Sequence, residues 1–465
     1  MREAVQTLSL IHICTSYNIV GTIPGKDPDA MVLMSAHYDS YFSGFQDDNA
    51  AIALMLGIAK GILASGYQPE KTLVFCAMAA EEWGVSDSRY DWSTGAYNQI
   101  FRVHPDWVGK VVADINFELP AMNEGETDQI RTSYELKTFT ESFKQSVPAV
   151  EGVFPQGIEV IVPTQTWSDD FSLSIAGVPS SVTALRGAFS QSHYHSQFDN
   201  QDTYSPEVFL FHHNMYGMLM LAYDRCAVSP LDFTTRLNAL RDTIDPSVLS
   251  AEQVSDLNAA LDEAESAAQA AWTRVFDVNA AYLAALDAGE TEQAEKLLAE
   301  SRALNDAVLK AFRFAEDSFV RLTWEDVSIF PHENGQNNIL ALDGAIAALE
   351  AGDAALALDE YLYLVDNNWY AYDWSRETFD HFTDYVLHQP AERLMWGAGR
   401  VQGHIDLFDV IRSLQDKRES GGDCSAELEI LRAAHAQAAA DLEGHVEQEL
   451  RDLQSLTGQL TALMQ

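Results

Sequence analysis

One continuous apolar run constrains the fold of this chain more than any other feature. Residues 71–78 read KTLVFCAM, with no regular alternation of polar and apolar positions. A strand of this kind is buried on both faces, which is typical of a central strand in a parallel sheet. Similar runs at 31–36 (MVLMSA) and within 108–117 (VVADINF) alternate with helical stretches. We therefore expect an α/β fold with a mixed, mostly parallel sheet that helices cover on both faces.

The character of the sequence changes after Ser229. Glycine becomes scarce, and Ala, Leu, Glu and Asp dominate the rest of the chain. Residues 250–253 (SAEQ) fit a capping box at the start of a long helix, and 425–463 carries apolar residues near heptad spacing. We therefore expect an α/β domain over residues 15–229 and an all-α helical domain over residues 230–465, with room for two subdomains.

The first residues look foreign to the rest of the chain. Residues 8–13 read LSLIHI, which is one translated frame of a common transposase adapter. We therefore expect residues 1–14 to be a non-native scar and the α/β domain to be truncated at its N-terminus. A signal peptide is not visible, and on this expectation its absence says nothing about location.

The charge of the chain excludes two classes of partner. Lys+Arg is 28 against Asp+Glu 70, a formal net charge of −42. Such a surface repels nucleic acid and anionic lipid, so we expect neither as a partner. No apolar run reaches the roughly 18 residues that a membrane-spanning helix needs, so we predict no transmembrane segment. The four cysteines form no C-x-x-C pair, so no thiolate zinc site is expected.

Polar residues follow two of the apolar runs at the point where each ends, and sites in open α/β sheets form at such ends. His37 and Asp39 come directly after 31–36. A histidine there can bind a metal while a neighbouring carboxylate accepts its other ring N–H. Glu81 and Glu82 follow 71–78. One glutamate can ligate a metal and the other can act as a general base.

Three further places complete this set. The acidic pair 47–48 precedes a buried helix, where a carboxylate could cap the helix or bridge two metals. Glu118 follows another strand, and Tyr194-His195 lies in a loop, with His193 as a competing candidate. Each has an ordinary structural interpretation alone. Together, two histidines and three acidic residues suit a borderline metal such as zinc.

In this order the motifs resemble those of the dinuclear zinc peptidases that include aminopeptidase Y, the bacterial leucyl aminopeptidases and glutamate carboxypeptidase II. The resemblance runs from Tyr17 to about Phe209. It rests on AHYDS (36–40), GFQDDNAAIALMLGIAK (44–60), AAEEWGVSDS (79–88), INFEL (115–119) and YHS (194–196). A fold of the zinc peptidase type is what this resemblance implies for the first half of the chain.

The resemblance implies two zinc ions per chain and a set of ligands for them. His37 and Glu118 would hold one zinc, and Glu82 and His195 would hold the other. Asp48 would bridge the two ions, because the segment DNAA resembles the family's D-N-A-S at the start of the helix.

The resemblance also implies roles for three further residues. Glu81 would be the general base, Asp39 would orient the first histidine, and Tyr194 could hydrogen-bond the oxyanion. The family usually has Asp where Glu118 stands, which puts metal affinity at that position in doubt and leaves Asp114 as a fallback.

The implied function is a zinc-dependent exopeptidase that hydrolyses the terminal bond of a peptide substrate. An acidic pocket would favour a free amine and hence an aminopeptidase, whereas Arg186 could pair with a substrate carboxylate in a carboxypeptidase. Two alternatives remain. Transferrin receptors resemble this family but lack peptidase activity, and glutaminyl-cyclase-like enzymes use the scaffold with a single zinc.

Two expectations about the whole protein come from the resemblance alone. One branch of the family carries a helical dimerisation domain, so a homodimer through the helical domain is the protein partner that the resemblance allows. Family members are mostly secreted or membrane-anchored, so we expect a secreted, periplasmic or cell-surface location.

Overall fold

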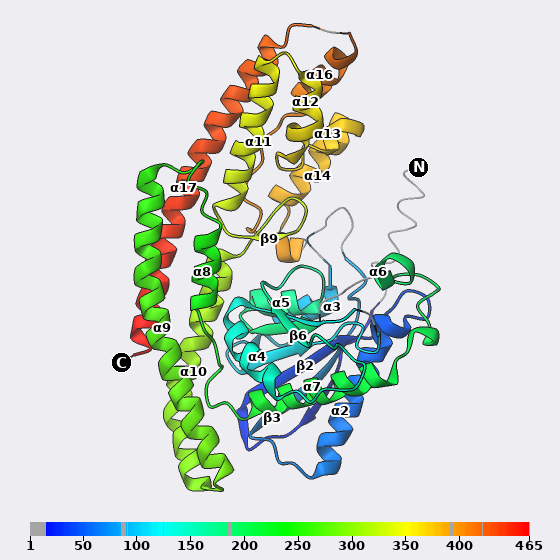
Figure 1. Cartoon of the computed structure of the whole chain (residues 1–465), viewed down its shortest axis with the longest axis vertical. Helices are drawn as coiled ribbons and strands as arrows, with labels where there is room; N and C mark the ends of the chain where they lie inside the picture. The colour runs from blue at the N-terminus through cyan, green and yellow to red at the C-terminus, as the bar shows by residue number, and fades with distance from the viewer. Residues whose placement is uncertain are drawn as a thin grey trace.

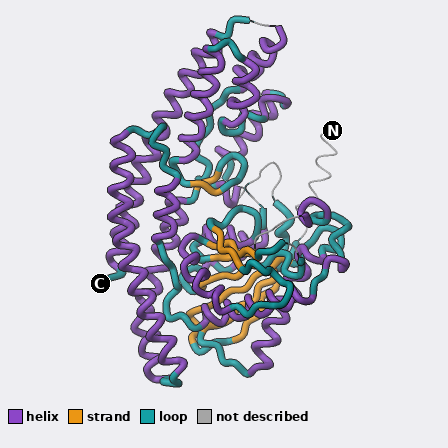
Figure 2. The backbone as a smooth tube through the Cα atoms, viewed as in Figure 1, coloured by secondary structure: helices purple, strands orange, loops and turns teal. Residues whose placement is uncertain are grey.

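The computed structural model describes residues 15–464, apart from 85–89, 91, 124, 184–187, 391–393 and 421. The expected scar at residues 1–14 lies outside the described residues. A sheet with its covering helices forms one part of the molecule, and long helices run beside it and beyond it (Figure 1). Figure 2 shows that the strands are concentrated in the first part and helices in the second.

The sheet has seven strands in the order β1-β3-β2-β4-β7-β5-β6. The neighbours among β3, β2, β4 and β7 pair in parallel, as do β5 and β6. β1 pairs antiparallel with β3, and β5 pairs antiparallel with β7. The predicted mixed, mostly parallel sheet is confirmed. The strands are β1 (Ile19–Ile23), β2 (Asp27–His37), β3 (Lys71–Met78), β4 (Val111–Asn116), β5 (Asp128–Thr132), β6 (Ile158–Ile161) and β7 (Ser180–Thr183).

Helices cover both faces of the sheet, as the buried central strand requires. Leu73 and Phe75 of β3 belong to the same hydrophobic cluster as α2 and α7. Val74 and Cys76, which point the other way, pack with α3 and α5. The helices of this part are α2 (Ala51–Ser65), α3 (Thr94–Asn98), α4 (Lys137–Phe143), α5 (Asp169–Ala176), α6 (Ala188–Ser192) and α7 (Pro206–Asp224).

One helical stretch, Phe45–Ser65, is long and apolar enough to cross a membrane when judged by length and composition alone. Its main part is α2, whose residues Leu54, Met55 and Ile58 are buried in the core. The core helix of a folded α/β domain passes the same test, so the finding is weak evidence for a membrane span.

The second half of the chain is almost entirely helical, as predicted. Ser250 and Gln253 form the expected capping box at the start of α9, because each side chain bonds the backbone N–H of the other. A short strand pair, β8 (Arg321–Leu322) with β9 (Ser328–Ile329), departs from the all-α expectation. The helices are α8 (Thr234–Asp242), α9 (Ala251–Asp287), α10 (Thr291–Phe319), α11 (Glu333–Glu350), α12 (Ala354–Leu356), α13 (Tyr370–Asp373), α14 (Arg376–His388), α16 (Phe408–Ser420) and α17 (Ser425–Ala462).

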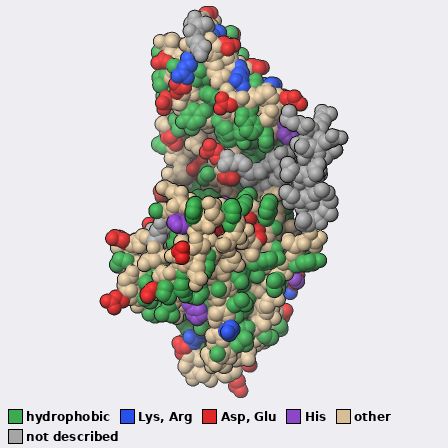
Figure 3. Space-filling view, turned by 90° about the vertical axis from the view of Figure 1, so that its right-hand side faces the viewer, with side chains coloured by type: hydrophobic (Ala, Val, Ile, Leu, Met, Phe, Trp, Pro, Cys, Tyr) green, Lys and Arg blue, Asp and Glu red, His purple; other side chains and the backbone are tan. Residues whose placement is uncertain are grey.

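The last helix ties the helical half together. α17 packs against both α9 and α11, and in Figure 1 α11 lies beside its upper part and α9 beside its lower part. The hydrophobic core cluster of the sheet continues without a break into these helices and reaches Leu463. The boundary between domains at residues 229 and 230 stays a prediction. Acidic side chains are spread over the face in Figure 3, where lysines and arginines are few, in keeping with the net charge of −42.

Candidate metal centre

The predicted site residues come together at one edge of the sheet. β2 ends at His37, which is paired in register with Met78 at the end of β3. Glu82 follows β3 and Glu118 follows β4, so these side chains reach the edge where the carboxyl ends of the parallel strands meet. The helical turn Phe45–Ala50, just before α2, places Asp47 and Asp48 at this same edge of the sheet.

Asp47 lies between two histidines that are far apart in the sequence. Its Oδ1 is 3.1 Å from His37 Nε2, and its Oδ2 is 3.3 Å from His195 Nε2. His195 Nε2 is also 3.1 Å from Glu82 Oε2. On the other side, Glu118 Oε2 is 3.8 Å from His37 Nε2. The carboxylate of Asp47 thus lies between two pairs of side chains: His37 with Glu118, and His195 with Glu82.

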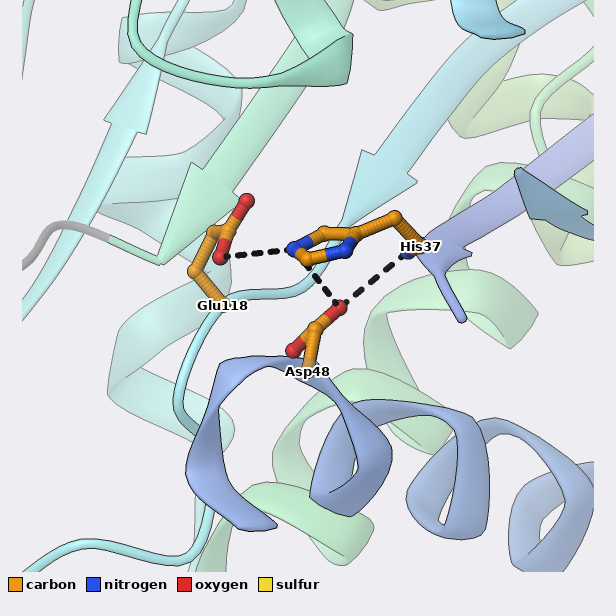
Figure 4. A group of neighbouring side chains, drawn as sticks. All are labelled: His37, Asp48 and Glu118. Carbon is orange, nitrogen blue, oxygen red and sulfur yellow. Dashed lines mark hydrogen bonds and ion pairs between the residues drawn. The ribbon is translucent and has the colours of Figure 1, made fainter. Parts of the chain in front are cut away.

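The structure differs from the sequence prediction at Asp48. This residue was expected between the two ligand pairs, but Asp47 occupies that place. Figure 4 shows Asp48, on the turn before α2, below the His37 ring, and Glu118 to the left of the ring. Asp48 Oδ2 accepts the backbone N–H of His37 at 3.2 Å and is 3.9 Å from Nε2. It therefore contacts one histidine, whereas Asp47 contacts both.

Asp39 holds the two glutamates as well as the first histidine. Its carboxylate accepts the backbone N–H groups of Glu81 at 3.1 Å and Glu82 at 3.2 Å. His37 Nδ1 lies 3.0 Å from the backbone oxygen of Asp39 and 3.6 Å from its carboxylate. The predicted contact with the histidine ring is present, with the backbone oxygen as the nearer partner. The hydrogen bonds to the glutamates were not predicted.

Glu81 lies next to this cluster with one oxygen already occupied. Its Oε1 accepts a hydrogen bond from the Ser93 hydroxyl at 3.1 Å, and its Oε2 is 3.9 Å from His37 Nε2. The backbone N–H of Ser93 also donates to the carbonyl of Glu81. The side chain is buried, and its fixed oxygen leaves the other one facing the cluster.

Tyr194 lies on the outer side of the cluster. Its ring stacks on the His195 ring with 3.7 Å between the centroids. Burial and the nearby carboxylates raise the pKa of the Tyr194 phenol, so the hydroxyl stays protonated and able to donate a hydrogen bond.

Besides Ser93, three supporting residues were missed by the sequence reasoning. Ser168 Oγ donates to Glu118 Oε1 at 2.5 Å and accepts from Asn116 Nδ2 at 2.5 Å. Asp199 accepts the backbone N–H of Asp47 at 3.0 Å. Ser168 stands at the N-cap position of α5, and Asp199 stands four residues after the loop histidine. Those positions are the only signals that could have pointed to them.

His193 and Asp114, the sequence-based alternatives to His195 and Glu118, lie outside the cluster. His193 Nδ1 bonds the Ser192 hydroxyl at 2.7 Å, and its ring stacks on Phe189. Asp114 is buried within β4 and accepts a hydrogen bond from Ser35. Neither belongs to the three groups of described residues that could hold a metal ion. Arg186 lies outside the described residues.

The electrostatics of the cluster show an excess of buried negative charge. Burial alone would raise the pKa of Asp47, but the facing imidazole rings of His195 and His37 outweigh it and lower the pKa to about 2. Burial raises the pKa of Glu82 to about 7, and it raises the pKa of Glu81 well above its usual range. Among the described residues, no Lys or Arg forms an ion pair with these carboxylates.

The donor atoms of the cluster fit a metal such as zinc. His37 Nε2, Asp47 Oδ2, His195 Nε2 and both carboxylate oxygens of Glu82 are buried and have no hydrogen-bond partner. Ligand atoms arranged tetrahedrally at about 2.0–2.1 Å from zinc lie about 3.3 Å from one another. The histidine–carboxylate separations His37–Asp47, His195–Glu82 and His195–Asp47 are 3.1, 3.1 and 3.3 Å. A cation would also offset the surplus negative charge.

The backbone at the site is held in conformations that L-residues rarely adopt. Ala80, Leu119 and His195 have positive φ values of 57°, 52° and 56°. Each such residue costs on the order of 1–3 kcal/mol, and such costs are tolerated mainly at functional sites. All three are at or next to predicted site residues, so the strain coincides with the cluster.

Known proteins with similar sequences match the first half of the chain. Residues 18–220 match the model of "Peptidase family M28". A probable leucine aminopeptidase 2 of Aspergillus oryzae is 24% identical over 266 residues, which cover 50% of each chain. A probable glutamate carboxypeptidase of Arabidopsis thaliana is 25% identical over 53% of this chain and 36% of that protein. This chain spans half of these relatives or less.

Solved structures give weaker similarity. A zinc aminopeptidase from Bacillus subtilis aligns with 44% of this chain and 49% of its own, at 17% identity and a TM-score of 0.34. A glutaminyl cyclase from Porphyromonas gingivalis aligns with 44% of this chain and 75% of its own, at 17% identity and a TM-score of 0.36.

The family match and the cluster involve the same residues. The range 18–220 contains every predicted ligand, both glutamates after β3 and the loop with Tyr194 and His195. The α/β part of this chain, over residues 18–220, is similar to peptidase family M28.

Proposed function

We propose that this protein is a zinc-dependent exopeptidase that hydrolyses the terminal bond of a peptide. The observation that carries the proposal is the position of Asp47, whose two oxygens face His37 and His195 at 3.1 and 3.3 Å. Glu118 beside the first histidine and Glu82 beside the second would complete two ligand sets, so two zinc ions per chain are proposed. The bridging role passes from Asp48 to Asp47.

The metal and the protein would divide the chemistry between them. Zinc ions held there would polarise the scissile carbonyl and lower the pKa of a water molecule. Glu81 would accept the proton of that water at Oε2, because Ser93 already occupies Oε1. The same carboxyl group would then deliver the proton to the leaving nitrogen. The Tyr194 hydroxyl would donate a hydrogen bond to the developing oxyanion.

Metal content and hydrolysis, measured together, test this proposal. We expect about two zinc ions per chain in the purified protein, and release of a terminal residue from a panel of aminoacyl and N-blocked peptides. Cleavage of substrates with a free amine would identify an aminopeptidase. Cleavage of N-blocked peptides with a free carboxylate would identify a carboxypeptidase.

The Glu81→Gln variant separates a general base from a structural residue. The amide cannot accept the proton, so we expect kcat to fall by about 10²- to 10⁴-fold while both zinc ions are retained. Glu151→Gln, on the exposed surface, is the matched control and should keep full activity. An active Glu81→Gln enzyme would overturn the assignment of the base.

The same measurements distinguish the alternatives. One zinc per chain with cyclisation of an N-terminal glutamine would identify a single-zinc glutaminyl-cyclase-like enzyme. Absence of both metal and hydrolysis would favour a receptor-like binding protein.

Two expectations about the whole protein also remain proposals. A homodimer through the helical half predicts twice the chain mass in light scattering. A secreted, periplasmic or cell-surface location predicts that the protein leaves the cytoplasm in cell fractionation.

A further inference from the structure

A short helical turn in the second half of the chain reaches the elements that carry the candidate metal centre. This turn, Met395–Gly397, has Trp396 at its middle, and the indole is 1% exposed. The indole N–H donates to Ser172 Oγ at 2.9 Å. The backbone N–H of Trp396 donates to the carbonyl of Tyr90 at 3.0 Å. One residue thus contacts two separate segments of the α/β part.

Each of these segments holds a carboxylate of the centre. Ser172 is on α5, and Ser168, the residue that precedes α5, donates to Glu118. Tyr90 is three residues before Ser93, whose hydroxyl and backbone N–H both bond Glu81. Trp396 is therefore connected to Glu118 through α5 and Ser168, and to the proposed base, Glu81, through Tyr90.

The packing around Trp396 leaves little freedom. A Cβ added to Gly397 would lie 2.6 Å from Tyr90 Cβ, so only glycine permits this approach. The Trp396 ring meets the Phe171 ring edge-on, with 5.6 Å between centroids. These residues share a hydrophobic cluster with Trp324 and Met395 of the helical half. Side chains in a packed cluster of this kind transmit displacement rather than absorb it.

We propose that Trp396 is a positioning residue for the metal centre, and that holding α5 and Tyr90 in place is one function of the helical half. The inference rests on the proposed function, because it assigns Trp396 to the placement of Glu118 and Glu81. Trp396 itself touches neither carboxylate. It acts through Ser172 on one side and through the Tyr90 carbonyl on the other.

The test replaces the indole while keeping an aromatic ring. In Trp396→Phe the bond to Ser172 is lost, and we expect kcat to fall about tenfold with KM changed less than twofold. Trp324→Phe is the matched control, because its indole is also buried in this cluster but donates to Gly403 within the helical half, at 3.2 Å. The kcat of Trp324→Phe should stay within twofold of wild type, even if its melting temperature falls as much as that of Trp396→Phe.

A second variant keeps the inference testable if Trp396→Phe folds poorly. Ser172→Ala removes the acceptor and should reproduce the loss in kcat. The double variant should be no worse than either single variant, because both remove the same bond. Equal losses in Trp396→Phe and Trp324→Phe, or additive losses in the double variant, would overturn the positioning role.

Amide hydrogen exchange of α5 tests the contact between Trp396 and α5 without an activity measurement. We expect the α5 amides to exchange faster in Trp396→Phe than in Trp324→Phe. Unchanged α5 exchange, with normal zinc content in wild type, would overturn this inference and leave the proposed function intact. Faster α5 exchange in Trp396→Phe, together with a wild-type protein that holds no zinc, would overturn the proposed function and the catalytic meaning of the contact.

Discussion

At the scale of single residues, two adjacent aspartates have different surroundings. Asp47 faces both histidines of the candidate centre, whereas Asp48 bonds the backbone of His37 and has one unpartnered buried oxygen. If Asp47 bridges two zinc ions, its loss removes a ligand from both sites at once. Loss of Asp48 removes a supporting contact from one ligand, which typically weakens metal binding by about 10–100-fold.

We therefore expect Asp47→Asn to lose both zinc ions under conditions where Asp48→Asn retains at least one. Competition with a zinc chelator, followed by metal analysis, measures the difference. The two variants carry the same chemical change at neighbouring positions, so each is the control for the other. Greater zinc loss in Asp48→Asn would restore the bridging role to Asp48.

The sequence allowed most of this cluster to be predicted, because strand ends are visible in it. His37 and Glu82 each follow a continuous apolar run, and their order along the chain carried the resemblance. The choice between Asp47 and Asp48 depended on how these two residues, which have non-helical φ/ψ inside the turn Phe45–Ala50, direct their side chains. Asp47 has φ −111° and ψ 88°, and no periodic pattern predicts such a conformation. Ser168 was missed because its partner is 50 residues away.

At the scale of elements, the packing of α11 against α17 contains a buried histidine and carboxylate. His332, at the start of α11, has Nδ1 at 2.8 Å from Glu449 Oε2 on α17. Burial would lower the pKa of His332, but the Glu449 carboxylate outweighs it and raises the pKa. The folded protein therefore holds this proton more tightly than the unfolded chain does.

The sign of the pH dependence follows from that difference. The stabilisation is fully present below the ordinary histidine pKa of about 6.5 and is lost as pH rises through the raised pKa. Between pH 6 and pH 9, the free energy of unfolding of wild type should fall relative to that of Glu449→Gln. The expected fall is about 1.4 kcal/mol for each unit of the shift. Urea unfolding at several pH values measures it, and parallel curves would contradict the assignment.

Elements with strong local signals were predicted from the sequence. β3 has the predicted limits, and Ser250 and Gln253 form the predicted capping box of α9. β5 was missed, because DQIRT is short and mostly polar. Asp128 and Thr132 are nevertheless buried, since β5 pairs with strands on both sides. Its position is decided by neighbouring strands and not by its own composition.

At the scale of the whole molecule, a buried group of charges joins the two halves. Arg236 of α8 binds Glu135 of the α/β part, with Nε at 2.6 Å from Oε1, and it also binds Glu316 of α10. All three side chains are almost fully buried. Removing the arginine would leave two buried carboxylates without their cation.

Arg236→Met should therefore lower the free energy of unfolding by about 3–5 kcal/mol. Arg241→Met on the same helix is the control, because Arg241 pairs with the more exposed Asp262 and Glu265. Its loss should cost less than about 1 kcal/mol. Adding Glu135→Gln and Glu316→Gln to Arg236→Met should recover much of the stability in urea unfolding. Equal costs for the two arginine variants would contradict a buried ion group.

The contact of Trp396 with α5 also has a consequence for the order in which the protein is made. Trp396 stands 224 residues after Ser172 in the chain. A ribosome that has synthesised all of the candidate zinc ligands still has the helical half to make before this support exists. If the proposed exopeptidase activity and this support both hold, the nascent chain lacks full activity until Trp396 has been synthesised.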